Sequence, residues 1–127
     1  MYPANIASGA VSDKALNNAF GGGAYVFACN HTGYTGSDGA IACGGLPSNA
    51  VKNQFFGIAM SNLGREACVS LLSSDWGTDG LVHVEVVGGN ATGTKAFPAA
   101  KLPINMITAG SACPKYGSRA SIVWTYY

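Results

Sequence analysis

The clearest pattern of hydrophobic and polar positions lies between Ser61 and Leu72, where apolar residues recur every three or four positions. This spacing is typical of an amphipathic helix with one buried face. Ser61 or Asn62 can cap its N-terminus, and Glu66 falls in the first turn, where the helix dipole favours an acidic side chain. The sequence therefore predicts a short helix over residues 61–72. Its expected buried stripe is Leu63, Ala67 and Leu71, widened by Cys68 and Leu72.

Strand patterns flank this helix. Alternating or continuous apolar positions predict strands over residues 25–29, 52–60, 81–87 and 119–127. Residues 97–102 have two prolines in or near them and predict an edge or irregular segment. Residues 105–113 have room for one helical turn.

The two most regular strands also indicate which side chains face the core. In the strand over residues 81–87, one face is expected to carry Val82, Val84 and Val86, and the other His83 and Glu85. In the strand over residues 119–127, Trp124 lies on the same side as Ile122 and Tyr126. We therefore expect Trp124 in the core.

Composition narrows the class of protein. The chain has 127 residues, of which 48% are apolar and 10% are charged, against about 25% charged in an average soluble domain. Its net charge is +1 with no basic cluster, so nucleic acid is not an expected partner. The chain is long enough for one domain with a single core, and its apolar content argues against disorder. A surface so poor in charge is common in secreted proteins and in subunits that pack against copies of themselves.

Four cysteines in a small, glycine-rich chain predict two disulfides and an oxidising compartment. Three pairings are open. We expect Cys29–Cys43 with Cys68–Cys113, because this pairing closes one local and one long loop without crossing. In the chain-entropy model these loops contribute about 3 and about 4 kcal/mol respectively. The first disulfide would close the base of a glycine-rich loop over residues 30–47.

The two histidines, His31 and His83, are candidates for metal binding or catalysis. No C-x-x-C occurs, and neither histidine stands at ligand spacing from a cysteine, so we expect no metal. A Ser-His-Asp site would use His31 beside Asp38 or His83 beside Glu85. At each position a surface histidine is the favoured interpretation. We therefore expect no enzyme and no cofactor.

Aromatic residues are the other candidates for a binding surface. Trp76 stands in a polar turn just after the predicted helix, and an exposed contact is as well supported there as burial. With Trp76, the expected surface contacts are His31, Tyr34 and Tyr116.

The sequence contains no run of about 20 apolar residues and no basic segment followed by an apolar one. For a chain with extracytoplasmic features, we expect a mature fragment, with any export or anchor segment upstream of residue 1.

Four segments, in chain order, carry a resemblance to a known family. They are Tyr2-Pro3, Phe20-Gly21-Gly22, Phe56-Gly57-Ile58-Ala59-Met60 and Asn62-Leu63-Gly64-Arg65-Glu66-Ala67-Cys68-Val69-Ser70-Leu71-Leu72. Together they resemble the soluble domain of type IVb pilins, which include the toxin-coregulated, bundle-forming and longus-type pilins and the thin-pilus pilins of enterobacteria.

The resemblance implies positions for two cysteines. In that family a strand precedes a short helix with the first cysteine, and the second cysteine closes the so-called D-region near the C-terminus. Cys68 and Cys113 fit these positions, and residues 119–127 fit the central C-terminal strand. Two features depart from the family pattern. Its long N-terminal helix does not occur in this sequence, and a Cys29–Cys43 pair is not general among its members.

The overall prediction is one α+β domain with an antiparallel sheet, short helices and two disulfides. The strand order is expected to be non-sequential, with the C-terminal strand inside the sheet. Residues 1–60 would form the αβ-loop region and first strand, residues 61–113 the short helix and D-region, and residues 114–127 the C-terminal strand.

The resemblance further implies an extracellular structural subunit of a type IVb pilus, anchored in the inner membrane before assembly. It would polymerise with copies of itself into a helical filament, touching the membrane only through the N-terminal helix. The filament would mediate adhesion, aggregation or attachment to a receptor on a host or bacterial cell. A secreted, disulfide-stapled β-rich module that binds carbohydrate or a receptor is the alternative. It would use Trp76 and the loop between Cys29 and Cys43. A pilin-type cleavage site and apolar helix upstream in the gene would favour the first hypothesis, and a conventional signal peptide the second.

Overall fold

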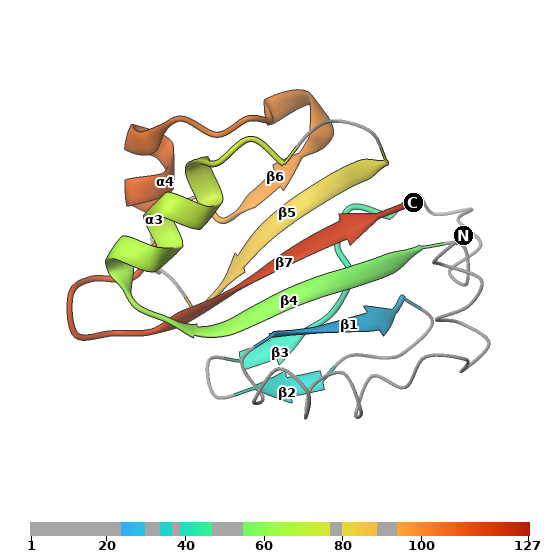
Figure 1. Ribbon diagram of the computed structural model, residues 1–127, viewed down its shortest axis with the longest axis horizontal. Helices are drawn as coiled ribbons and strands as arrows, with labels where there is room; N and C mark the ends of the chain where they lie inside the picture. The colour runs from blue at the N-terminus through green and yellow to red at the C-terminus, as the bar shows by residue number, and fades with distance from the viewer. Residues whose placement is uncertain (1–23, 30–33, 37–38, 47–54, 77–79, 89–93) are drawn as a thin grey trace.

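The structure is a computed structural model that describes residues 24–29, 34–36, 39–46, 55–76, 80–88 and 94–127. Its main element is a five-stranded antiparallel sheet with strand order β1-β4-β7-β5-β6 (Figure 1). These strands are β1 (Ala24–Ala28), β4 (Phe56–Leu63), β5 (Leu81–Val87), β6 (Ala96–Pro98) and β7 (Ala120–Tyr126). A separate two-stranded sheet consists of β2 (Tyr34–Gly36) and β3 (Gly39–Ile41).

Two short helices lie together at one end of the sheet (Figure 1). They are α3 (Arg65–Ser73) and α4 (Met106–Ala112), and a 3-10 turn, η2 (Ala99–Lys101), follows β6. The predicted α+β class, the non-sequential antiparallel sheet and the inner position of the C-terminal strand are confirmed. The edge segment expected near residue 97 is β6. The helix α4 is longer than the single turn expected over residues 105–113.

Strand β7 lies between β4 and β5, which come earlier in the chain. Trp124 is paired with Ile58 of β4 on one side and with Val84 of β5 on the other. All seven residues of β7 are at least partly buried, and six are fully so. The alternation in its sequence therefore supplies both faces of the sheet with core side chains.

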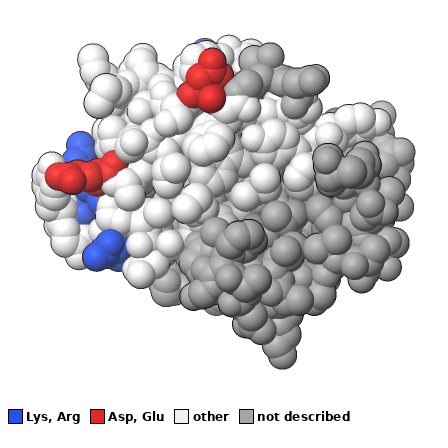
Figure 2. Space-filling view, in the orientation of Figure 1, with Lys and Arg blue, Asp and Glu red and all other residues white. Residues whose placement is uncertain are grey.

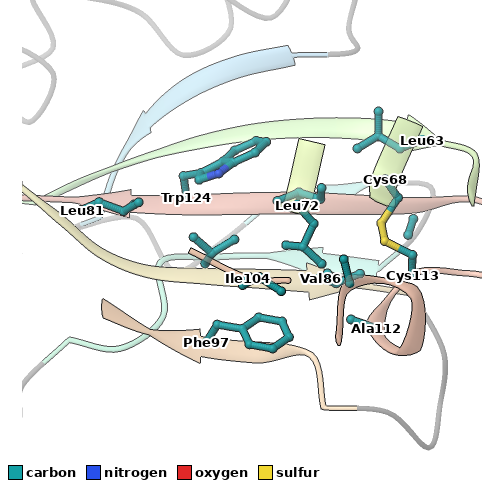
Figure 3. Close-up of a cluster of buried hydrophobic side chains, with 14 residues drawn as sticks. Leu63, Cys68, Leu72, Leu81, Val86, Phe97, Ile104, Ala112, Cys113 and Trp124 are labelled. Carbon is teal, nitrogen blue, oxygen red and sulfur yellow. A yellow bond between two sulfur atoms is a disulfide. The ribbon is translucent and has the colours of Figure 1, made fainter. Parts of the chain in front are cut away.

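The main core fills the space between the helices and one face of the sheet (Figure 3). Trp124 is 3% exposed and belongs to it, which confirms its predicted burial. Its buried members are Leu63, Cys68, Leu72, Leu81, Val84, Val86, Phe97, Ile104, Ala109, Ala112, Cys113, Ala120, Ile122 and Trp124.

A smaller core lies on the opposite face. It consists of Phe27, Ala59 and Val123, with Cys43 and Val87 packed against it. Polar side chains are buried on the same face: His83 and Thr125 share the alternation of Val87 and Val123. Among the described residues, the core on this face is therefore smaller and more polar than the one under the helices.

The start of α3 differs from the prediction. Residues 61–63 continue β4, because Leu63 is paired with Ala120 of β7. A register shift precedes this pair, and there Asn62 adopts a positive φ of 60°, which asparagine tolerates better than most residues. Ser61 and Asn62 are thus not helix caps, and α3 begins after Gly64 with no side-chain cap.

The buried stripe of α3 is consequently narrower than predicted. Cys68 and Leu72 are its buried residues, whereas Ala67 is exposed and Leu71 is only half-buried. The position of Glu66 in the first turn is as predicted. The disulfide fixes Cys68 inward, and a four-residue spacing then carries Leu72 to the same side.

The face of β5 also differs from the prediction at its first residues. A register shift against β7 lies between Leu81 and His83, so two residues of β5 oppose one of β7 there. Leu81 enters the main core in place of Val82, which is half-buried. Val84 and Val86 face the core as predicted.

Part of the segment predicted as a glycine-rich loop over residues 30–47 consists of strands. Among its described residues, β2 and β3 pair antiparallel, with Tyr34 opposite Ile41. The predicted strand over residues 25–29 is β1, which pairs with β4 at one edge of the sheet. The strand predicted over residues 52–60 corresponds to β4, which begins at Phe56. Residues 52–54 lie outside the described residues.

Both predicted disulfides are present. Cys29 is bonded to Cys43 and Cys68 to Cys113, with Cα–Cα distances of 5.5 and 5.8 Å. Among the described residues no cysteine is free. Two disulfides in a chain of this size are typical of proteins that fold in an oxidising compartment.

We expect the two disulfides to stabilise the fold unequally. Replacing Cys68 and Cys113 together with alanine should lower the free energy of unfolding by about 4 kcal/mol, and replacing Cys29 and Cys43 by about 3 kcal/mol. The reason is that their sequence separations are 45 and 14 residues. Urea unfolding of the two double variants measures both values. An equal or larger loss for the Cys29–Cys43 variant would contradict the loop-entropy explanation.

Candidate functional site

The helices α3 and α4, joined by the Cys68–Cys113 disulfide, form a rigid unit that we call the helix pair. Arg65, in the first turn of α3, reaches the end of α4. Its Nη1 donates hydrogen bonds to the carbonyl oxygens of Gly110 (3.1 Å) and Pro114 (3.2 Å). Carbonyl groups at a helix C-terminus have no partner within the helix, and a guanidinium supplies charged donors to them. Arg65 therefore ties the two helices together by polar contacts beside the disulfide.

The sequence around α4 explains which side it buries. Asn105 caps the helix, because its side chain accepts a hydrogen bond from the backbone N–H of Thr108 at 2.8 Å. Ala109, Ala112 and Cys113 are small and buried, so α4 can lie close to α3 and the sheet. This spacing places Ile107 on the opposite side.

Three large apolar side chains on or just after α4 are exposed. Met106 is 69% exposed, Ile107 is 85% exposed and Tyr116 is 76% exposed. Between α3 and α4 lies an open groove of about 550 Å³ with a mixed lining that includes Arg65, Glu66, Met106 and Tyr116. Exposed apolar side chains that share a groove, as Met106 and Tyr116 do, are more informative than isolated ones, because such patches mark interaction sites.

The charged side chains near the helix pair lie mainly at one end of it. Figure 2 shows one face on which most of the described surface carries no charge, and the basic side chains visible there gather mainly at the end where β7 starts. Arg65, Glu66 and Arg119 lie together there, lining a hollow of about 390 Å³ with Tyr116. The Arg65 guanidinium lies over the Tyr116 ring, with 5.8 Å from Cζ to the ring centroid.

Trp76 is only partly available as a contact. Its side chain is 43% exposed, but its Nε1–H donates to the carbonyl oxygen of Leu71 at 2.7 Å. Its ring meets Trp124 edge-to-face at 5.2 Å between centroids. Trp76 thus covers one end of the main core and presents the rest of its surface outward.

The predicted contact residues do not form one site. Trp76 bonds to the C-terminal part of α3, and Tyr116 lies at Arg65 in its first turn. A nine-residue helix is about 13 Å long, so these two aromatic side chains lie at opposite ends of it. Tyr34 begins β2, and His31 lies outside the described residues.

Sequence reasoning missed the main contributors to the apolar surface, Met106 and Ile107. The signal for them was present: Ala109, Ala112 and Cys113 have the spacing of a buried helix face. A single helical turn over residues 105–113 was expected, and one turn is too short to have a buried and an exposed face. The exposed side of α4 was therefore not predicted. The role of Arg65 had no sequence signal, since its acceptors are backbone carbonyls 45 and 49 positions away.

His83 is not the surface histidine that the sequence favoured. It is 7% exposed and lies on the second face of the sheet, where residues 44 and 45 pass over its ring. The predicted alignment with Glu85 is correct, because His83 Nε2 and Glu85 Oε1 are 4.0 Å apart. Burial lowers the pKa of His83 below its ordinary value of 6.5, and the Glu85 carboxylate opposes part of that shift. The imidazole is thus enclosed rather than offered to a substrate.

Within the described parts of the chain, no three His, Cys, Asp or Glu side chains are grouped so that they could hold a metal ion.

None of the helices in the described segments has the length and apolar character needed to cross a bilayer.

No family model, curated protein or solved structure matches this chain.

The tie between Arg65 and α4 can be tested by substitution. Arg65→Ala should lower the free energy of unfolding by about 1.5 to 3 kcal/mol, because it leaves two part-buried carbonyl groups without their charged donor. Arg65→Lys should restore only part of this loss, since an ammonium lacks the planar fork of the guanidinium. Chemical unfolding measures both effects. Lys115→Ala, at a neighbouring exposed position, is the control, and an equal loss there would contradict the assignment.

Proposed function

We propose that this chain is the globular domain of a filament subunit of the type IVb pilin kind, which packs outside the cell against copies of itself. The observation that carries the proposal is the path of the chain from β4 through Cys68 of α3 to Cys113 and then into β7 at the centre of the sheet. This order of strand, cysteine-bearing helix, second cysteine and central C-terminal strand is the one that the sequence resemblance implies.

The rigidity of the helix pair supports a role in assembly. A disulfide, two hydrogen bonds from Arg65 and the main core hold α3 and α4 in place. A surface that is already ordered loses little conformational entropy on association, so more of its apolar contact contributes to affinity. In a filament the same contact is repeated at every subunit, so the small entropy loss favours assembly at each step.

The chemistry of the surface supports the same role. Met106, Ile107 and Tyr116 offer apolar area, and the chain carries charge on only 10% of its residues. Burying a charge without a partner at an interface costs several kcal/mol, so a surface poor in charge is suited to close lateral packing. The partner in this proposal is a second copy of the chain, and the remaining exposed surface would meet a host or bacterial cell.

The alternative, a secreted binding module, is less well supported. Its binding face would combine Trp76 with the loop between Cys29 and Cys43, and that loop lies partly outside the described residues. In stacking sites the indole N–H often serves as the polar end of the ring, but here that group is bonded to Leu71 of the same chain.

The proposal predicts that a charge on the helix pair blocks assembly. In the bacterium that encodes the chain, Ile107→Asp in the full native gene should lower the yield of sheared surface filaments at least about tenfold, the effect of about 1.4 kcal/mol per contact. Filaments would be counted by electron microscopy with an antibody to this domain. Ala100→Asp adds the same charge at an exposed position of η2 and serves as the control.

Two results would contradict the proposal. One is a wild-type strain that secretes the chain only as a monomer, and the other is a normal filament yield from the Ile107→Asp strain. A secreted monomer that binds glycans through the helix pair or Trp76 would instead support the binding module.

A further inference from the structure

A short backbone segment crosses the second face of the sheet directly over His83. We call residues 43–46 the glycine strap, since Gly44 and Gly45 form its centre. The Gly44 N–H donates a hydrogen bond to Thr125 Oγ1 of β7 at 3.2 Å. Gly45 lies directly against the side chain of His83 in β5. The strap is thus joined to the two strands at the middle of the sheet.

The contact between strap and imidazole is close enough to require glycine. A Cβ on Gly44 would lie 2.6 Å from Cε1 and 2.7 Å from Nδ1 of His83, and a Cβ on Gly45 would lie 2.7 Å from three of its other carbon atoms. Gly45 also has a positive φ of 70°, which favours glycine. The backbone therefore seals the ring from water without a side chain in between.

Few groups near the imidazole can respond to its charge. The Nδ1 atom of His83 is buried and has no hydrogen-bond partner among the residues that the structure describes. On β5 the facing charged group is Glu85, 4.0 Å from Nε2. The neighbours on the other elements carry no charge. They are Thr125 on β7, Pro98 and Ala96 on β6, and Gly44 and Gly45 on the strap. Among the described residues, Glu85 is thus the charged group that faces His83.

We propose that His83 and the glycine strap form an acid-opened latch. The neutral ring supports the strap from below. Protonation of Nδ1 would place an N–H donor and a positive charge directly beneath Gly44. In the closed state the described residues offer that donor no acceptor and the charge is shielded from water, so the closed state loses stability. Separation of the strap from the sheet lets water reach the ring. The Cys29–Cys43 disulfide holds the start of the strap, so the movement is confined to the residues after Cys43.

The direction of the pH dependence follows from the burial of the ring. In the open state His83 titrates near its ordinary pKa of 6.5, whereas burial lowers its pKa in the closed state. The open state therefore binds more protons, and the closed fraction falls as the pH drops below about 6.5. The latch would operate whether or not the chain forms filaments.

Amide hydrogen exchange followed by NMR tests the latch in the disulfide-intact protein. Between about pH 7.5 and about pH 5, the protection factor of the Gly44 amide should fall severalfold and by no more than about 30-fold, because pH 5 lies about 1.5 units below the open-state pKa of 6.5. Amides of the β4–β7 ladder should keep their protection. The midpoint should coincide with the titration of the His83 ring signals.

Three variants separate the latch from general acid sensitivity. His83→Phe keeps a flat ring under the strap but does not titrate, so Gly44 protection should no longer depend on pH. Glu85→Gln removes the carboxylate that opposes the effect of burial, so the pKa of His83 in the closed state falls further and acid should reduce Gly44 protection more than in the wild type. His31→Phe, at the other histidine of the chain, should behave as the wild type.

Three results would overturn the proposal. They are unchanged Gly44 protection across the pH range, loss of β4–β7 protection at the same midpoint, and the same acid response in the His83→Phe variant. If that variant does not fold, a His83 titration in the wild type that does not coincide with Gly44 opening overturns it equally.

Discussion

The pairing of β7 with β4 and β5 is the constraint on which the rest of the structure depends. Both partners come much earlier in the chain, so the pairing closes long loops and carries an entropic cost. The Cys68–Cys113 disulfide reduces that cost, because it joins a residue shortly after β4 to one shortly before β7. Once Cys113 is held at Cys68, few residues separate the link from the first β7 pair, Leu63 with Ala120. The same bond positions the helix pair over the core, so the sheet and its cover are specified together.

The two faces that β7 separates are stabilised differently. Under the helices, Ile122 and Trp124 enter a large apolar core in which many contacts must be lost before any part can detach. On the other face, the described contacts of the strap with Thr125 and His83 are the hydrogen bond from Gly44 and the close approach of Gly44 and Gly45 to the imidazole. Segments with few buried apolar contacts open at the lowest free-energy cost. In the proposed latch, the strap is therefore the described segment that would respond to a charge beneath it.

Much of the fold could be predicted from periodicity, since the strands near residues 84 and 123 direct alternate side chains to the two faces of the sheet and the order of the cysteines suggested both disulfides. The errors arose where pairing between distant segments overrides a local pattern. Leu81 replaces Val82 in the core because β5 shifts register against β7. Residues 61–63 extend β4 because Leu63 pairs with Ala120, although their local pattern is helical. Of the candidate site, the aromatic residues were noticed, but the burial of His83 depends on glycines about 40 positions earlier, and no local signal encodes that.

The helix pair and the strap lie on opposite faces, so one can change without the other. In the described part of the chain the main core contains only apolar side chains and one disulfide, and none of these groups titrates in mildly acidic solution. Acid would therefore act on the face that holds His83 and leave the exposed surface of α4 in place. In the filament subunit proposed above, lateral contacts through α4 would persist in an acidic medium while the cover of the other face loosens. The apolar core under the helices and the titratable group on the opposite face both follow from a central strand whose side chains alternate between the two faces.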